Sequence, residues 1–366
     1  MLISMKIVII SSLFPPNSYG GAEQIACAEA EKLAREGNKV IVLTLKFDKG
    51  YACSTSDAKN LQIIEVSHKN IFNYYNIGKK SICLRFIWHI IDTFNFRLAN
   101  DIAEILKRES PDIVTCHNIK GLSLLTPLKI KKLKIKNYAV VHDVSFYTPS
   151  GLIEWGKEKS WEHMGVLTRI YRFFTRRLMS YPEKIFFPSR WLLDFYYKNG
   201  FFINQEKLYK PNELGFVCEN KSVDSGGKVA NNFLYVGKIE HHKGILLLLD
   251  AFERLKPTNV TLDIIGNGVL MSEVKKHAQT NPNIKIHGQI SREKLPEFYR
   301  NAKAVIVPSV VYENAPNVVY EALSCGVPVI VARIGGACEP IIEGKNGYIF
   351  NPGDVDDLVE KMKKYL

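Results

Sequence analysis

Short apolar runs with the composition of β-strands recur along the whole chain and alternate with helical stretches. The runs are IVII, VIVL, IIEV, DIVTC, YAVV and KIFF in the first half, and FLYV, LDII, IKIH, AVIV, VIVA and GYIF in the second. This alternation is typical of parallel sheets whose strands are covered by helices on both faces. With 366 residues, the chain is long enough for two domains with a core each. The sequence therefore predicts an α/β protein with two Rossmann-like domains.

A polar segment that contains glycine, CENKSVDSGGKVANN, separates the two series of strands. Such composition is typical of a linker, because it can bury little apolar surface. We predict an N-terminal domain over residues 1–212, a linker over 213–231 and a C-terminal domain over 232–366.

The stretch ENAPNVVYEALSCGVPVIVARIGG says most about function. Glu313 and Glu321 are separated by seven residues, and Pro316 between them suits the first turn of a helix that ends before Gly326. The start of a helix offers free backbone N–H groups to a phosphate, and a carboxylate in its first turns can accept two hydrogen bonds from a sugar diol. This arrangement indicates a nucleotide-sugar site.

Two N-terminal motifs follow predicted strands. Gly20 and Gly21 lie in a loop between the first strand and an amphipathic helix, where glycine lets the backbone approach a diphosphate closely. His142 and Asp143 end the strand in VVHDVSFYTP, where a parallel sheet brings residues to its carboxyl edge. A single histidine in such a place is more often structural than catalytic.

Two further motifs lie in the predicted C-terminal domain. In FLYVGKIEHHKG, Lys238 and Lys243 flank a turn that could close on a diphosphate, although an exposed turn with solvated lysines has the same pattern. In LDIIGNG, Gly266 and Gly268 follow another strand, which by itself is a weak signal because it is common in doubly wound sheets.

These motifs, in this order and over nearly the whole chain, resemble those of the retaining family-4 glycosyltransferases with the GT-B fold, whose E-x7-E motif corresponds to Glu313 and Glu321. The resemblance implies two Rossmann-like domains facing each other across a cleft. It also implies transfer of a sugar from a nucleoside-diphosphate donor to a hydroxyl group of an acceptor, with retention of configuration.

The resemblance also assigns roles to individual residues. It implies that Glu313, His142 and Lys243 are the catalytic residues, with His142 contacting the donor sugar. The implied donor-binding residues are Gly20, Gly21, Lys238, Lys243, Gly266, Ile290, Asn317, Val318 and Glu321. No cofactor and no metal are expected. The DVD sequence at 354–356 resembles a metal-binding Asp-x-Asp, but its place at a helix start favours capping.

The chain departs from the family pattern at three places. Asn314 and Ala315 stand where Gly-Phe is usual, and Lys238 stands where arginine is usual, which removes a bidentate contact to phosphate. The helix predicted from Val355 is the last element before Leu366, whereas family members normally continue. The C-terminal domain is therefore expected to be naturally short or truncated.

Two alternatives to transfer remain open: a sugar-nucleotide epimerase and an inactive glycosyltransferase-like binding subunit. The expected acceptor is a glycan or a lipid-linked glycan in cell-surface polysaccharide or lipopolysaccharide assembly, an inference from fold-level analogy. The motifs do not distinguish among sugars, bases or acceptors. A pI of about 9.2 suggests nucleic-acid binding as a further alternative, but no nucleic-acid-binding module is recognisable. No nucleic-acid partner is therefore expected.

The positive charge is concentrated in the first half of the chain. Residues 1–215 contain 31 Lys and Arg against 20 Asp and Glu, a net charge of +11, whereas residues 216–366 carry +1. The segments 129–136 and 169–177 hold five lysines and four arginines, respectively, which suits an anionic lipid surface. We hypothesise peripheral membrane attachment through both segments; the alternative is a solvated basic face.

Cysteine usage and the N-terminus indicate a cytoplasmic protein. The seven cysteines include no Cys-x-x-Cys pair, so neither a disulfide framework nor a zinc site is expected. The start MLISMKIVIISSLF imitates a signal peptide, but it lacks an obvious cleavage site and coincides with the first predicted strand.

Overall fold

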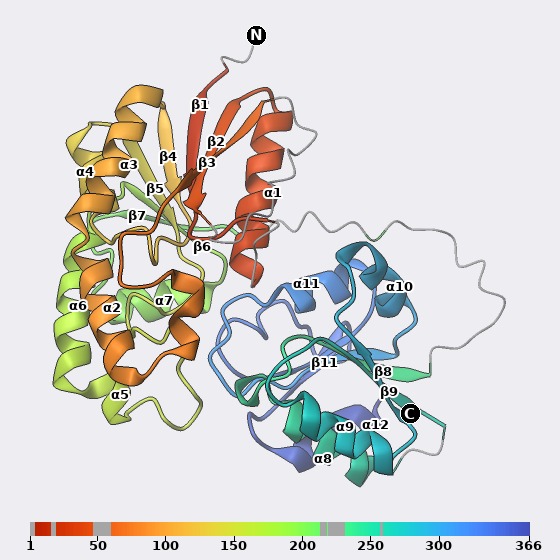
Figure 1. Ribbon diagram of the computed structural model, residues 1–366. Coiled ribbons are helices and arrows are strands. Elements are labelled where there is room, and N and C mark those ends of the chain that lie inside the picture. The colour runs from red at the N-terminus through yellow and green to blue at the C-terminus, as the bar shows by residue number, and fades with distance from the viewer. Residues whose placement is uncertain (1–3, 16–19, 47–59, 213–217, 219–230, 257–258) are drawn as a thin grey trace. The chain divides into compact units, whose positions relative to one another are not determined.

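The computed structural model describes residues 4–15, 20–46, 60–212, 218, 231–256 and 259–366. The chain forms two compact units (Figure 1). Unit 1 comprises Met1–Gly151 and Ser160–Gly215, and unit 2 comprises Leu152–Lys159 and Phe216–Leu366. Most of the predicted linker lies outside the described residues, and the segment Leu152–Lys159, which we expected in the N-terminal domain, groups with unit 2.

Unit 1 is built on a seven-stranded sheet in which all neighbouring strands are parallel, in the order β3-β2-β1-β4-β5-β6-β7. Each predicted apolar run forms a strand. The strands are β1 Lys6–Ile10, β2 Lys39–Leu45, β3 Leu61–Val66, β4 Ile113–Cys116, β5 Lys136–Val140, β6 Lys184–Phe187 and β7 Glu206–Tyr209. Strand β7 was not predicted, because its four residues, EKLY, include two charged side chains and form an edge strand with no apolar run.

Helices cover both faces of this sheet (Figure 1). Helix α1 packs on β2 through Ala26, Ala30 and Ala34, whose small side chains let it lie close to Val40 and Val42. Helices α3 and α4 pack together on the opposite face. The helices of unit 1 are α1 Gly21–Arg35, the 3₁₀-helix η1 Tyr74–Lys79, α2 Ile82–Thr93, α3 Phe96–Glu109, α4 Thr126–Lys132, α5 Trp161–Met164, α6 Val166–Leu178 and α7 Arg190–Lys198.

Unit 2 has a six-stranded parallel sheet in the order β10-β9-β8-β11-β12-β13. All six predicted runs form its strands: β8 Asn232–Val236, β9 Thr261–Ile265, β10 Ile284–Gly288, β11 Ala304–Val307, β12 Val329–Ala332 and β13 Gly347–Phe350. Its helices are η2 His241–Lys243, α8 Ile245–Leu255, α9 Met271–Thr280, η3 Arg292–Lys294, α10 Leu295–Arg300, α11 Asn317–Ser324 and α12 Val355–Lys363.

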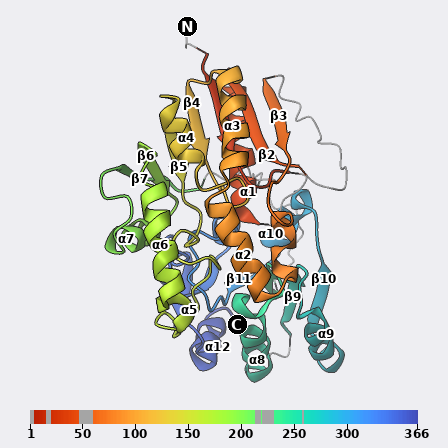
Figure 2. The ribbon, with the colours of Figure 1, turned by 60° about the vertical axis from the view of Figure 1, so that its left-hand side comes forward.

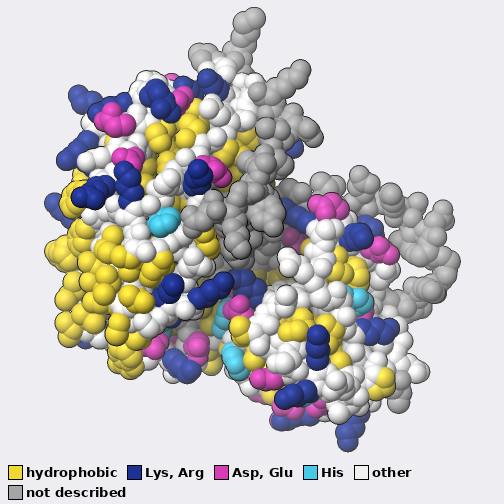
Figure 3. Space-filling model, in the orientation of Figure 1, with side chains coloured by type: hydrophobic (Ala, Val, Ile, Leu, Met, Phe, Trp, Pro, Cys, Tyr) yellow, Lys and Arg dark blue, Asp and Glu magenta, His cyan; other side chains and the backbone are white. Residues whose placement is uncertain are grey.

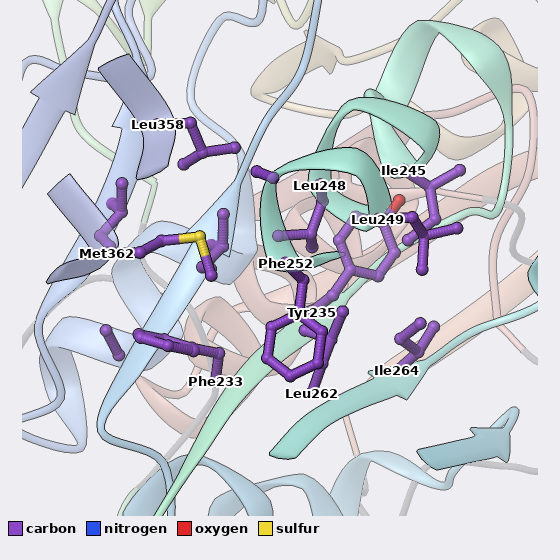
Figure 4. Packing of buried hydrophobic residues seen from close by; sticks show 14 of the residues in the cluster. Phe233, Tyr235, Ile245, Leu248, Leu249, Phe252, Leu262, Ile264, Leu358 and Met362 are labelled. Carbon is purple, nitrogen blue, oxygen red and sulfur yellow. The ribbon is translucent and has the colours of Figure 1, made fainter. Parts of the chain in front are cut away.

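The core of unit 2 joins the sheet to α8 and α12 (Figure 4). Phe233 and Leu262 of the sheet pack with Leu248 and Phe252 of α8 and Met362 of α12, and all five are fully buried. Burial of each such side chain stabilises the fold by roughly 1.5–3 kcal/mol.

Helix α12 begins with a side-chain cap. The carboxylate of Asp354 accepts a hydrogen bond of 3.0 Å from the backbone N–H of Asp357. The predicted capping role of the Asp-x-Asp sequence is thus confirmed for Asp354. The second acid, Asp356, pairs with Arg254 of α8 at 2.9 Å.

Both sheets reverse their strand order once: between β1 and β4 in unit 1, and between β8 and β11 in unit 2. Ligands of open parallel sheets bind outside the carboxyl ends of the strands at such switch points. The loops that follow these four strands are therefore the first places to examine for a site.

The expectation of cysteines without a disulfide is wrong. Cys218 and Cys325 form a disulfide in unit 2, with Cα atoms 5.2 Å apart although 107 residues separate them in the chain. Sequence spacing is informative only for closely spaced cysteine motifs, and here the fold brings two isolated cysteines together.

The segment Leu152–Lys159 joins unit 2 through backbone pairing beyond β11. Trp155 donates its N–H to the carbonyl of Val310 at 2.9 Å, and Tyr312 donates to Ile153 at 3.0 Å. The Tyr312 hydroxyl also donates to the carboxylate of Glu158 at 2.9 Å.

Among the described residues, no helix is both long and apolar enough to cross a membrane.

Candidate functional site

The switch point of unit 2 places a lysine against a glutamate. The Lys243 ammonium follows β8 and donates a hydrogen bond of 2.5 Å to Oε1 of Glu313, in the loop after β11. Ser309 donates its hydroxyl to the same oxygen at 2.9 Å. Burial alone would raise the pKa of Glu313, but Lys243 and Ser309 outweigh it and lower that pKa below its ordinary value. Glu313 is therefore an anion held in one orientation.

The backbone holds the loops after β8 and β11 together. The backbone carbonyl oxygen of His242 accepts a hydrogen bond of 3.0 Å from the N–H of Val310. Gly244 has φ +72°, and a Cβ atom there would collide with the carbonyl oxygen of Pro308. Only glycine allows both this conformation and this close approach. The positions of Lys243 and Glu313 therefore depend on Gly244.

Glu321 lies on α11, the predicted helix, which starts at Asn317 with Pro316 as its N-cap and is followed by Gly326 at φ +72°. The Glu321 carboxylate is buried and accepts a hydrogen bond of 2.8 Å from the Tyr299 hydroxyl. Burial raises the pKa of Glu321 despite this hydrogen bond and the nearby Arg292 guanidinium, 3.9 Å away. In this structure, Glu321 is thus held in place by Tyr299 and Arg292.

The remaining predicted donor residues of unit 2 lie in neighbouring loops. Lys238 is exposed just after β8, and Ile290 is partly buried after β10. A Cβ atom at Gly266 would collide with the carbonyl of Gly237, and one at Gly268 with Ile239. Close packing against the backbone of Gly237 and Ile239 therefore explains why glycine occupies both positions of the GNG motif. Asn317 and Val318 form the first turn of α11, at its N-terminal end.

Unit 1 contains a row of three ionisable side chains at its own switch point. His142 follows β5, and its Nε2 lies 3.0 Å from Nδ1 of His117, which directly follows β4. Nε2 of His117 lies 3.3 Å from the carboxylate of Glu29 on α1. Burial would raise the pKa of Glu29, but the two histidines and Lys210 lower it to about 2. Burial, reinforced by His117, lowers the pKa of His142 to about 3.

The ionised Glu29 favours the His117 tautomer with its proton on Nε2. Nδ1 of His117 and Nε2 of His142 share one proton in the hydrogen bond between the two rings. His142 is therefore neutral at pH 7, and its contact with His117 holds the ring in place.

Gly20 and Gly21 begin α1 beyond the end of β1, where Gly20 is the N-cap with an extended backbone. The four residues before Gly20 lie outside the described residues.

The structure brings together some of the predicted residues and adds others. Lys243 and Glu313 are in contact, while Glu321 bonds to Tyr299. The partners Ser309, Tyr299, His117 and Glu29 were not predicted. One signal could have found His117, because DIVTCH and YAVVH are both strand runs that end in histidine. Nothing in the sequence marked Glu29 or Tyr299. Within the described part of the chain, no group of three His, Cys, Asp or Glu side chains is arranged to hold a metal.

Two family models match the chain. The model "Glycosyltransferase Family 4" matches residues 19–207, which is more than half of the chain, and "Glycosyl transferases group 1" matches residues 209–366. The chain belongs to glycosyltransferase family 4. The predicted family and the predicted GT-B class, with two parallel-sheet α/β domains, are thus confirmed.

Among curated proteins, this family-4 glycosyltransferase is 25% identical to an uncharacterised 42.6 kDa protein in the cps region of Klebsiella pneumoniae, over 92% of this chain and 87% of that protein. It is 27% identical to the lipopolysaccharide 1,2-N-acetylglucosaminetransferase of Salmonella typhimurium, over 55% of this chain and 58% of the relative. Among solved structures, HepE of Anabaena in complex with UDP matches with a TM-score of 0.69 and 16% identity, covering 98% of this chain and 89% of HepE.

Proposed function

We propose that this glycosyltransferase moves a sugar, with retention of configuration, from a nucleoside-diphosphate donor to a hydroxyl group of a glycan or lipid-linked acceptor in polysaccharide or lipopolysaccharide assembly. The main support is the Lys243–Glu313 pair at the switch point of unit 2. The buried Glu321 follows Glu313 in the chain after a short loop and the first turn of α11. The relatives in the Klebsiella cps region and in Salmonella lipopolysaccharide synthesis support the acceptor class, and the UDP complex of HepE supports the donor class.

The reaction mainly requires stabilisation of the departing diphosphate. When the bond between the sugar and the phosphate oxygen breaks, negative charge develops on that oxygen. Lys243 keeps two N–H donors beyond the one that Glu313 accepts, and Lys238 and the N–H groups at Asn317 and Val318 add positive potential. A charge-assisted hydrogen bond of this kind contributes roughly 1.5–3 kcal/mol.

Carboxylates and a histidine bind the rest of the donor in this proposal. Glu321 accepts hydrogen bonds from the ribose hydroxyls, and Glu313 accepts them from the sugar. The neutral His142 contacts the sugar through its ring and is not assigned as a base. Gly20, Gly21 and Gly266 let backbone approach the diphosphate, and Ile290 lies against the base. Transfer is proposed to need no metal.

Thermal unfolding with UDP, GDP, ADP and dTDP tests the donor site. One nucleotide should raise the midpoint selectively, because a ligand at 100 times its dissociation constant stabilises a protein by about 2.7 kcal/mol. The Glu321→Ala variant should lose this shift. NMR of the product then tests retention, and EDTA treatment tests metal independence. No shift with any of the four nucleotides would contradict the proposed donor class.

A further inference from the structure

Helix α6 turns a stripe of polar side chains toward the protein. Thr168, Arg172 and Thr175 are buried. The Thr175 hydroxyl donates to the carbonyl of Phe146 at 2.7 Å, and Arg172 donates through Nε to the carbonyl of Tyr147 at 3.0 Å. A surface helix of a water-soluble protein normally buries its apolar stripe and exposes its polar one. Helix α6 instead buries this polar stripe and exposes large apolar side chains, although three of its arginines are exposed as well and Leu178 is buried.

Helix α2 is reversed in the same way. Its carboxylate, Asp92, is buried and accepts hydrogen bonds from the N–H groups of Gly121 at 3.0 Å and Ser123 at 3.3 Å. Its indole, Trp88, is also buried and donates to the carbonyl of Phe72 at 2.8 Å. These contacts fix the rotation of α2, and its isoleucine, leucine and phenylalanine side chains consequently point outward.

Helices α2 and α6 lie side by side, as both ribbon views show (Figure 2). The ring of Phe94, at the end of α2, meets the ring of Phe174 edge to face, with the ring centroids 5.0 Å apart. The outward side chains form a continuous apolar area over α2, α5 and α6 (Figure 3). We name it the α2–α6 surface, defined by six side chains that are each 44–72% exposed: Ile82, Phe86, Ile90, Trp161, Ile170 and Phe173. Monomeric soluble proteins rarely expose apolar patches of this kind without a partner.

The charges at the α2–α6 surface are positive. In α2 and α6, all of whose residues the structure describes, no carboxylate is exposed, and α5 exposes one, Glu162. The exposed cations on α6 and just before α2 are Arg169, Arg176, Arg177, Lys79 and Lys80. An apolar face with aromatic side chains and flanking cations is complementary to an anionic bilayer surface.

We propose that the α2–α6 surface docks on an anionic lipid bilayer, with its apolar side chains among the acyl chains and its cations at the headgroups. This narrows the two-segment hypothesis drawn from the sequence. The lysines of residues 129–136 lie in and after α4, where no large apolar side chain is exposed, and α4 lies at the far end of unit 1 from α5 (Figure 1). That segment is a solvated basic face and is not part of the docking surface.

Vesicle co-sedimentation of the full chain tests the proposal, with phosphatidylcholine alone and with added phosphatidylglycerol. The wild type should bind the anionic vesicles at least about tenfold more tightly than the neutral ones. The double variant Ile170→Glu/Phe173→Glu should lose that binding at least about tenfold. Quenching of Trp161 fluorescence by brominated lipid, absent in Trp161→Phe, should report insertion of this side chain.

A matched variant separates the surface from net charge. Ile203 and Ile342 are 64% and 56% exposed and lie outside the α2–α6 surface. Ile203→Glu/Ile342→Glu changes the charge equally and should bind as the wild type does. Circular dichroism checks folding, and Ile82→Ser/Phe86→Ser gives a second, uncharged variant that should also lose binding.

Three results would overturn the proposal. The first is no binding of the wild type to anionic vesicles. The second is an equal loss of binding in both double glutamate variants. The third, from light scattering without vesicles, is a dimer that Ile170→Glu/Phe173→Glu abolishes while vesicle binding is unchanged, which would assign the surface to a second copy.

Discussion

The side chains of Lys243 and Glu313 meet at 2.5 Å, although 70 residues separate them in the chain. Their strands, β8 and β11, are parallel neighbours, so the loops after them emerge at the same edge of the sheet. Both side chains are partly exposed, at 28% and 14%, respectively, so the pair is accessible to a ligand as well as being part of the fold.

Because the pair is only partly exposed, removing one partner leaves the other charge unpaired in a partly buried place, so the losses from the two single changes should not add. We expect Lys243→Met to lower the free energy of unfolding of unit 2 by about 1–2 kcal/mol, and Lys243→Met/Glu313→Gln to be less destabilised than the sum of the single variants. Urea unfolding of the wild type, Lys243→Met, Glu313→Gln and the double variant measures the coupling free energy between the two side chains. Strict additivity would show that the contact contributes nothing to stability.

The two glutamates of the motif should affect different steps. Glu321→Ala should weaken nucleotide binding at least about tenfold, because Glu321 is proposed to hold the ribose. Glu313→Ala should leave the nucleotide thermal shift nearly unchanged and slow sugar transfer. Ser324→Ala removes an exposed hydroxyl that donates to the backbone carbonyl of Glu321 but leaves both carboxylates in place, so it is the control. Wild-type turnover in both glutamate variants would refute these roles.

Gly244 should tolerate no side chain. It has the same φ as Gly326, +72°, but a Cβ atom at Gly326 would meet nothing within 4 Å. Gly326→Ala should therefore cost about 1–2 kcal/mol from the left-handed backbone alone. Gly244→Ala should cost more, because it also forces the loop of Lys243 away from Pro308, and it should reduce nucleotide binding. Similar unfolding midpoints for the two variants would argue against the close approach.

Glu29 should act through His117 and His142. We expect Glu29→Gln to reduce turnover by up to about a hundredfold, because loss of the carboxylate charge removes what orients His117 and, through it, His142 at the sugar. The nucleotide thermal shift, which reports on unit 2, should not change. Glu36→Gln, at an exposed position directly after α1, should behave as the wild type. A pH–rate profile that is identical for Glu29→Gln and the wild type would remove the positioning role.

Asp92 should make stability depend on pH. Burial raises its pKa from 3.8 to about 7 despite two backbone hydrogen bonds. The folded state thus binds this proton more tightly, so the contribution is complete below pH 3.8 and is lost as pH rises toward about 7. The free energy of unfolding of the wild type, minus that of Asp92→Asn, should fall by about 4 kcal/mol across this range. A pH-independent difference would mean that Asp92 is ionised throughout.

Strands and helices were largely predictable from local pattern. All twelve apolar runs formed strands, and α11 and the Asp354 cap of α12 lie where predicted. These features depend on residues within one or two turns of each other. Strand β7 escaped because EKLY has no apolar run, so only pairing with β6 reveals it.

The sequence by itself determined the strands, the order of the motifs and, through them, the family. Only the tertiary structure decided which residues meet: the Cys218–Cys325 disulfide, the contact of His117 with Glu29, and the rotation of α6 that buries Arg172 and exposes Phe173. The physical reason is that helical and strand periodicity reflects neighbours in the chain. Contacts between distant residues are set instead by strand order and by the buried hydrogen bonds that fix each helix on its sheet.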